Sequence, residues 1–421
     1  MKRSKGGSKR AERLQRITGK TPPAIAVSRD VKYAHRVEPA KFAVQEEESL
    51  VKHTYKLFQR AGRAYRWIAF IALLVPACGL GAGARFTKAV FGFNMNEVAK
   101  KVATLTERYH DVYVVGLEFS PDSSQIAMNA DSGELDVWNW REGKILKTLE
   151  VPRGFNWGGA INPIQYSPDG RLLSVCEGKG AGHVVLRLWE TRDWSIARDI
   201  VDTGPGGCQS AAFTPNGRFL LYVIDRIRSQ ELIAYSTDTW SLAWTAHLDT
   251  GPEAIAVSPD GHFAAVSGTT IVRQNTGQAN SLATLRYEQT IDLVDLVGRR
   301  LVRTFYGDAS GSVAWSPDSA RLAVAGHGYV EMFEVPSGER IAHDALPKSA
   351  HMNLRFTPDG RYLIESDSNG RGTGLGVSIW NSKRAERLQR IPGNAATIAV
   401  SRDVKYLAVG GTGKTSIWQF R

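Results

Sequence analysis

Cysteine is scarce in this 421-residue chain. Its three copies, Cys78, Cys176 and Cys208, form no CxxC or CxxCH motif and no Cys/His cluster at metal-ligand spacing. This pattern excludes a zinc ribbon, a c-type haem site and a disulfide scaffold. Cys176 and Cys208 could pair if the protein reaches an oxidising compartment, but we expect two unpaired thiols that act as small hydrophobic residues.

Catalytic motifs are also lacking. The nine histidines are scattered and no G-x-S-x-G element occurs. The segment "AVGGTGKT" (408–415) matches a relaxed phosphate-loop pattern, but only six residues follow it, so we interpret it as a hairpin turn. A recurring set of Asp residues is interpreted as turn chemistry rather than as catalytic carboxylates: Asp122, Asp169, Asp260, Asp318 and Asp359. We therefore expect no enzyme activity, no cofactor and no metal.

Positive charge is confined to one end of the chain. The net charge is +11, and residues 1–66 carry 17 Lys and Arg against 6 Asp and Glu. Residues 67–421 then carry 36 of each sign, so the larger part of the chain is neutral. A neutral body disfavours nucleic-acid binding, and a 43% hydrophobic content is enough for a sizeable core.

One long hydrophobic run is present, from Trp67 to Ala84, with no charge in 18 residues and a basic flank before it. The run predicts either a signal peptide cleaved near Ala84 or a transmembrane anchor that holds the remainder on the periplasmic, extracytoplasmic side. The alternative of a buried core helix is disfavoured, because 18 uncharged residues are long for one.

A short pattern then returns seven times, as in "PIQYSPDGRLLSV" from Pro163 and "NLRFTPDGRYLIE" from Asn353. Its Ser/Thr anchors are spaced 47, 47, 44, 58, 41 and 44 residues apart: Ser120, Ser167, Thr214, Ser258, Ser316, Thr357 and Ser401. Each pattern is a strand, a Pro-Asp-Gly turn and a second strand, and most are followed by two further strands. This period predicts one four-stranded propeller blade per repeat.

With these motifs the chain resembles the WD40 family, in particular bacterial WD40-like proteins with a repeated S-P-D-G turn. The resemblance covers about residues 101–421 and implies an all-β, seven-bladed β-propeller of four-stranded blades. The family's Gly-His pair is missing, and Trp-Asp is replaced by pairs such as Trp138-Asn139 and Trp189-Glu190, so its buried His and Asp network is not carried over. We expect three regions: a basic extension (1–66), the signal or anchor segment (67–84) and the propeller (97–421).

The last blade ends without a fourth strand. We predict that Lys101 to Glu107, which resembles the fourth strands of other repeats, closes it and removes an open edge. The segment "SKRAERLQRI" occurs twice, at 8–17 and 382–391. Each copy is followed by "IAVSRDVKY", at 25–33 and 398–406. We assign the second copy, with this continuation, to the sixth and seventh blades. We interpret residues 1 to about 40 as the remnant of a tandem duplicate, with a role in switching or domain swapping as the alternative.

Irregular sequence gathers in the loops expected on one face of the propeller: 152–162, 177–183, 267–289 and 366–376. Long loops on a rigid scaffold are where binding usually resides. The binding residues that we predict there are Phe155, Trp157, His183, Arg273 and Arg371.

Two functions are compatible with these features. The first is a non-enzymatic scaffold, a monomeric propeller that is exported or anchored and binds a protein or peptide partner through its loop-rich face. The alternative is a propeller hydrolase or a quinone- or metal-dependent enzyme with a site in the central channel, for which the sequence shows no ligand set.

Overall fold

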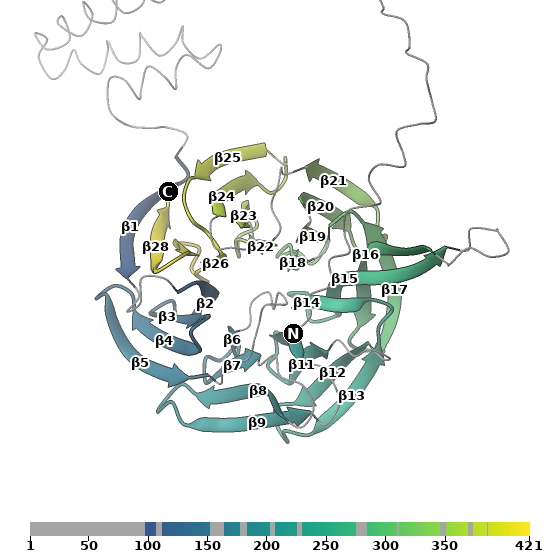
Figure 1. The fold of residues 1–421 in the computed structure, drawn as a ribbon, viewed down its shortest axis with the longest axis horizontal. Helices are drawn as coiled ribbons and strands as arrows, with labels where there is room; N and C mark the ends of the chain where they lie inside the picture. Colours follow the sequence, from purple (N-terminus) through teal and green to yellow (C-terminus); the bar gives the residue numbers. More distant parts are fainter. Residues whose placement is uncertain are drawn as a thin grey trace, which may run out of the picture. The chain divides into compact units, whose positions relative to one another are not determined.

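The computed structural model describes residues 97–106, 112–151, 164–176, 183–202, 207–224, 230–274, 284–309, 311–326, 328–345, 351–368, 374–384 and 386–421. In these residues seven four-stranded sheets stand around a common centre as the blades of a β-propeller (Figure 1). These ranges contain no helix, and so none that could cross a membrane. The predicted fold class is confirmed, whereas the basic extension and the segment 67–84 lie outside the described residues.

Each blade contains strands A to D, counted from the centre outward, and six blades take four consecutive strands. Blade 1 consists of β2 (Val114–Phe119), β3 (Gln125–Ala130), β4 (Glu134–Asn139) and β5 (Lys144–Glu150). Blade 2 consists of β6 (Ile164–Tyr166), β7 (Leu172–Cys176), β8 (His183–Glu190) and β9 (Ile196–Asp202). Blade 3 consists of β10 (Cys208–Phe213), β11 (Phe219–Ile224), β12 (Glu231–Ser236) and β13 (Leu242–His247). Blade 4 consists of β14 (Gly251–Val257), β15 (Phe263–Gln274), β16 (Thr284–Asp295) and β17 (Arg300–Gly307). Blade 5 consists of β18 (Ser312–Trp315), β19 (Arg321–Gly326), β20 (Tyr329–Glu334) and β21 (Arg340–Ala345). Blade 6 consists of β22 (His351–Phe356), β23 (Tyr362–Ser368), β24 (Gly374–Asn381) and β25 (Glu386–Ile391).

Blade 7 takes its strands from both ends of the propeller. It consists of β26 (Thr397–Val400), β27 (Tyr406–Gly410), β28 (Lys414–Phe420) and β1 (Ala99–Thr106). The antiparallel pairing of β1 with β28 confirms the predicted closing strand. The antiparallel pairing of β27 with β28 confirms that 408–415 forms a hairpin. The second copy of the duplicated segment, 382–391, contains β25 of blade 6, and its continuation at 398–406 reaches from β26 to the start of β27 in blade 7, as predicted. The first copy, 8–17, lies outside the described residues.

The closing strand is held at its start by Gln389 of β25. The Gln389 Oε1 atom accepts hydrogen bonds from the backbone N–H groups of Val98 (2.7 Å) and Ala99 (2.8 Å). The Gln389 Nε2 atom donates to the Ala99 carbonyl at 2.9 Å. One side chain of blade 6 therefore satisfies three backbone groups of the strand that closes the ring.

The turn between strands A and B has the same hydrogen bonds in every blade. In blade 2 the Ser167 hydroxyl donates to Asp169 Oδ1 (2.6 Å) and accepts from the Leu172 N–H (2.9 Å). The equivalent pairs recur at all other anchors. The repeated Asp side chains are therefore committed to turns, which confirms the structural interpretation of these carboxylates.

These turns also pack against one another. Gly170 has a φ of 75°, and a Cβ atom there would lie 3.3 Å from the ring of Pro121 in the preceding blade. Gly261 and Pro215 are related in the same way, at 3.7 Å. The turn sequence thus recurs because it bends the chain and also because it fits the proline of the neighbouring blade.

Apolar side chains fill the seams between the blades. Between blades 1 and 2, for example, Leu135 and Val137 pack with Leu173 and Val175, all of them fully buried. Full burial of such a side chain stabilises the fold by about 1.5–3 kcal/mol. No blade could bury both of its faces alone, so the ring is the smallest stable unit.

The cysteine expectation was wrong. Cys176, the last residue of β7, forms a disulfide with Cys208, the first residue of β10, and their Cα atoms are 5.4 Å apart. The two residues lie 32 positions apart in the chain but face each other across the seam between blades 2 and 3. The sequence lacked this information because the pairing depends on how neighbouring blades are placed.

Candidate functional site on the loop-rich face

The two faces of the propeller are built differently. The A–B turns, on one face, are short and uniform, while the B–C and D–A connections, on the other, vary in length. Of the predicted binding residues, Phe155, Trp157 and Arg371 lie outside the described residues. The backbone places His183 at the start of β8, opposite Asp202, and places Arg273 near the end of β15. The structure therefore does not test the five residues as a site.

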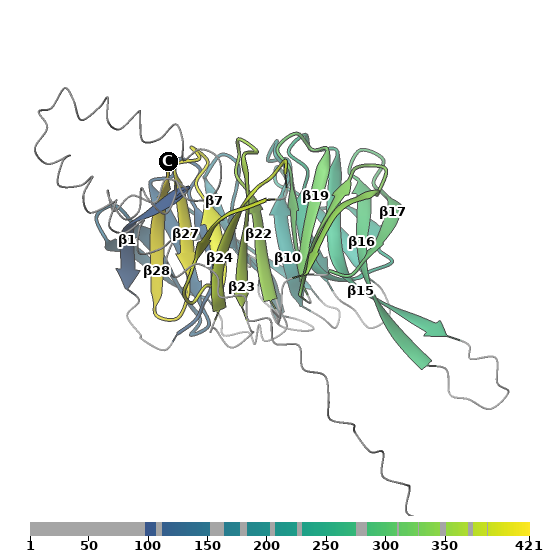
Figure 2. The ribbon, with the colours of Figure 1, turned by 90° about the horizontal axis from the view of Figure 1, so that it is seen from above.

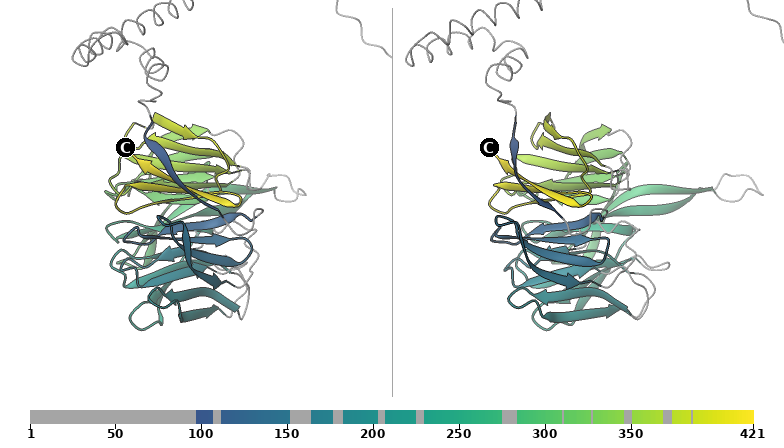
Figure 3. Two further views of the ribbon diagram at one scale, coloured as in Figure 1. Left: turned by 90° about the vertical axis from the view of Figure 1, so that its left-hand side faces the viewer. Right: turned by 60° about the vertical axis from the view of Figure 1, so that its left-hand side comes forward.

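The most conspicuous feature of the loop-rich face is a projecting β-arm. Strands β15 and β16 have 12 residues each, and their far ends extend beyond the ring (Figures 1, 2 and 3). The strands on either side end earlier: β14 pairs with β15 only as far as Thr269, and β17 pairs with β16 only from Gln289. Residues 270–274 and 284–288 thus pair only with each other. We call these two segments the arm.

The segment 267–289 was expected to be an irregular loop, and this expectation was wrong for most of it. Residues 267–274 and 284–289 are strand, which is consistent with their β-branched and aromatic content. The base of the arm is held by hydrogen bonds from Thr269 Oγ1 to Gln289 Oε1 (3.1 Å) and from Thr270 Oγ1 to the Asp249 carbonyl (2.7 Å).

Two large apolar side chains are exposed on one side of the arm, which we call its apolar side. Ile271 and Tyr287 are directly opposite each other on the paired strands, with 56% and 64% of their surfaces exposed. Side chains at odd-numbered positions of β15 and β16 lie on the same side of the sheet as Ile271 and Tyr287. Within the ring, two residues of this set, Ala265 and Leu293, are buried against blade 5. The apolar side of the arm therefore looks toward blade 5, beyond the end of the buried seam.

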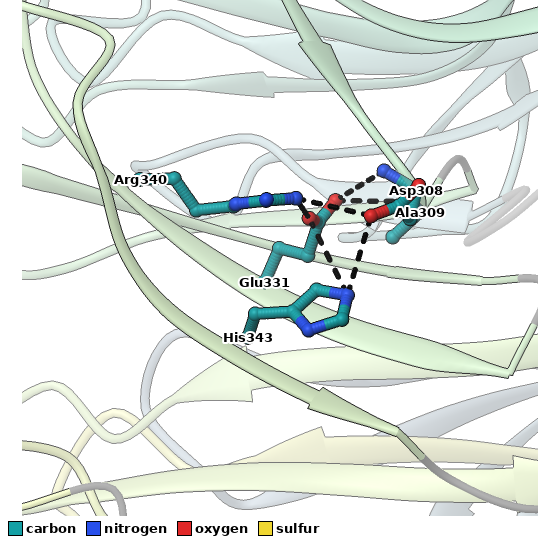
Figure 4. A network of polar contacts seen from close by, with 5 residues as sticks. All are labelled: Asp308, Ala309, Glu331, Arg340 and His343. Carbon is teal, nitrogen blue, oxygen red and sulfur yellow. Dashed lines mark hydrogen bonds and ion pairs between the residues drawn. The ribbon is translucent and has the colours of Figure 1, made fainter.

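A polar cluster lies at the neighbouring edge of blade 5 (Figure 4). Glu331, on β20, is fully buried, and its Oε2 atom accepts hydrogen bonds from the backbone N–H groups of Asp308 (2.8 Å) and Ala309 (3.0 Å). Arg340 Nη1 lies 2.6 Å from Glu331 Oε1 and 3.0 Å from Asp308 Oδ2. His343 Nε2 lies 3.3 Å from the same Asp308 oxygen. The cluster fixes the connection between blades 4 and 5 and leaves Asp308, Arg340 and His343 partly exposed.

Three of these residues have the donor types of a metal site. One ligand atom each of Asp308, Glu331 and His343 lies within 4.8 Å of the others. The Arg340 guanidinium, however, already contacts both carboxylates and supplies the positive charge that balances them. The two hydrogen bonds that Arg340 donates raise its pKa further, and the one to Glu331 contributes most. The residues therefore fit an ion-pair network better than a metal site.

Blade 4 has a similar buried acid. Asp292 Oδ2 accepts from the N–H groups of Asp249 (2.7 Å) and Thr250 (3.0 Å), and Thr304 donates to Asp292 Oδ1 (2.7 Å). Burial raises the pKa of Asp292. The sequence analysis missed Asp292 and Glu331. A shared pattern could have revealed them, because each lies two positions before the apolar residue near the end of its strand C, as Asp136 lies two positions before Trp138.

Comparisons with known proteins agree with this architecture. No family model matches the chain. An uncharacterized WD repeat-containing protein of Deinococcus radiodurans is 29% identical over 112 residues, which are 25% of this chain and 43% of that protein. Among solved structures, Kuenenia stuttgartiensis hydrazine synthase superimposes with a TM-score of 0.58 at 16% identity, covering 74% of this chain and 96% of that one. The latter similarity concerns the fold alone. The repeat similarity and the seven blades together support a WD40-like propeller.

Proposed function

We propose that this WD40-like propeller is a non-enzymatic scaffold that binds a protein or peptide partner through its loop-rich face. The observation that carries the proposal is the arm, whose exposed Ile271 and Tyr287 lie opposite each other beyond the ring. The binding surface comprises the apolar side of the arm and the exposed atoms of the blade 5 cluster, Asp308, Arg340 and His343.

The energetics of the arm support this proposal. A two-stranded hairpin that projects alone is marginally stable in water, and its outer backbone groups lack a third strand. Isoleucine and tyrosine at its exposed side gain free energy when a partner covers them, and tyrosine is enriched at the centres of protein interfaces. The charged groups beside the arm carry both signs and supply the polar rim that such an interface needs.

The disulfide supports a location outside the cytoplasm. Disulfides such as Cys176–Cys208 form and persist mainly in oxidising compartments. This agrees with the proposal that the segment 67–84 is a signal peptide or an anchor that places the propeller on the extracytoplasmic side. Fractionation of cells that express the full chain, with the mass and N-terminal residue of the product, separates secretion after cleavage near Ala84 from anchoring.

The partner-binding proposal can be tested by site-specific photo-crosslinking. A crosslinker is placed at Tyr287 and, as a matched control, at Tyr306 of β17, which is equally exposed at 64%. We expect a discrete crosslinked partner from position 287 and none from 306. The double variant Ile271→Ser/Tyr287→Ser should reduce the affinity of the purified partner at least tenfold, while Tyr306→Ser leaves it unchanged.

Two results would contradict the proposal. One is equal crosslinking from both positions, and the other is unchanged affinity of the arm variant. Metal analysis of the purified protein separates the proposal from the enzyme alternative, because a stoichiometric ion would favour a central-channel enzyme.

A further inference from the structure

Blade 6 departs from its own repeat at one buried position. Eight residues after the Ser/Thr anchor, strand B of the other six blades carries a buried apolar or aromatic side chain: Met128, Val175, Tyr222, Val266, Val324 and Val409. In blade 6 the equivalent residue is Glu365, which is only 1% exposed. A carboxylate therefore stands in the seam between blades 5 and 6 where the repeat otherwise places a hydrocarbon or an aromatic ring.

The surroundings of Glu365 satisfy only half of the group. Trp380 Nε1 donates to Glu365 Oε2 at 3.2 Å, whereas the buried Glu365 Oε1 atom has no hydrogen-bond partner among the described residues. Asp367, two residues along the same face of β23 and 3% exposed, likewise has a buried and unpartnered Oδ1 atom. Its Oδ2 atom lies 3.3 Å from Arg390 Nη2.

The remaining neighbours do not neutralise Glu365. On the adjacent strands of blade 6, Leu354 and Ser378 are directly opposite Glu365, and Ser378 is uncharged. Blade 5 contributes the buried Ala323, Ala325 and Met332 to this seam. The charged groups that face the seam are Asp367, Arg387 and Arg390 of blade 6 and, by strand alternation in blade 5, Arg321, Glu334 and Asp344. Arg321 is engaged by the Ser382 carbonyl at 2.9 Å.

A proton would relieve this arrangement. A buried carboxylate that lacks a partner is costly, and protonation removes its charge and turns one oxygen into a donor. We propose that Glu365 is a proton-binding site and that the seam between blades 5 and 6 is a pH-sensitive element of the propeller. Glu365 lies in the middle of β23, three residues before the strand ends at Ser368 and the B–C connection of blade 6 begins.

The titration range is physiological. Burial, the largest influence, and the neighbouring Asp367 together raise the pKa of Glu365 from 4.5 to about 7, against the lowering effects of Trp380, Arg390 and Arg387. The folded protein thus holds a proton that the unfolded chain has released above pH 4.5. The contribution of Glu365 to stability is therefore fully present below pH 4.5, is lost as the pH rises from 4.5 to about 7, and is constant above that.

The test is chemical denaturation of the wild type and of Glu365→Gln between pH 4.5 and 9, in buffers that contain EDTA. We follow the ratio of the wild-type unfolding constant to that of the variant. This ratio should rise about tenfold per pH unit above pH 4.5 and become constant near pH 7, after a total increase of about 300-fold. The pH at which the rise ends is the break. Asp367→Asn should move this break to lower pH, because it removes a like charge. Glu339→Gln, at an exposed position, is the matched control and should keep the wild-type profile.

A second variant guards against local repacking. Glu365→Val restores the residue type found in four of the other blades and should also abolish the break near pH 7. The proposal is overturned if Glu365→Gln and Glu365→Val retain the wild-type pH profile. It is equally overturned if the wild type shows no break, or if the break appears only when EDTA is replaced by calcium, which would indicate a cation site.

Discussion

Closure of the ring by Gln389 leads to a quantitative prediction. Replacing Gln389 with Met keeps the length of the side chain but removes three hydrogen bonds, to Val98 N, Ala99 N and Ala99 O. A hydrogen bond of this kind contributes about 0.5–1.5 kcal/mol, and partly buried backbone groups left without a partner cost more. We therefore expect Gln389→Met to lower the free energy of unfolding by about 2–4 kcal/mol.

The assay combines urea denaturation with hydrogen exchange of the peptide that contains β1. Exchange should accelerate in β1 and in its partner β28, and remain unchanged in β11, which lies in blade 3. Glu386→Ala, at an exposed position on the same strand as Gln389, is the control and should change stability by less than about 0.5 kcal/mol. A loss below 0.5 kcal/mol for Gln389→Met, with normal protection of β1, would refute the idea that this side chain secures the closing strand.

Three further predictions follow from single contacts. Replacing Cys176 and Cys208 with Ser should cost about 3–4 kcal/mol under oxidising conditions, as expected for a loop of 32 residues, and calorimetry with and without reductant checks this. Gly307→Ala should destabilise the protein by about 1–3 kcal/mol, because the new Cβ atom would collide with the Glu331 carboxylate, and denaturation measures the loss. The hydrogen bond from its anchor serine lowers the pKa of Asp318, so this turn contributes stability above the unfolded pKa near 4 that is lost as the pH falls further. Asp318→Asn should flatten that acid limb in a thermal-melt series.

Local patterns explain what could be predicted about the fold. The recurring Ser/Thr anchor and its Pro-Asp-Gly turn specify a hairpin through hydrogen bonds within six residues, as at Ser167 and Leu172. The spacing of the anchors then implies one blade per repeat, and the missing last strand implies a closing strand from the other end. These inferences need only short-range chemistry and the rule that sheet edges must be covered.

The candidate site was less predictable. The long segment 267–289 was predicted as an irregular loop, whereas the arm depends on where β14 and β17 stop pairing with β15 and β16. Glu331 and Asp292 were missed because an acid in a strand looks like a solvent-exposed residue until the backbone N–H groups that it caps are placed beside it.

The sequence by itself therefore determined the repeat, the hairpins, the number of blades and the means of closure. The tertiary structure alone decided the pairing of Cys176 with Cys208, the projection of the arm and the burial of Glu365. The division has a physical reason. Turn and strand preferences act between residues close in the chain, whereas a disulfide, an exposed face or a buried charge is defined by neighbours that only the assembled ring brings together.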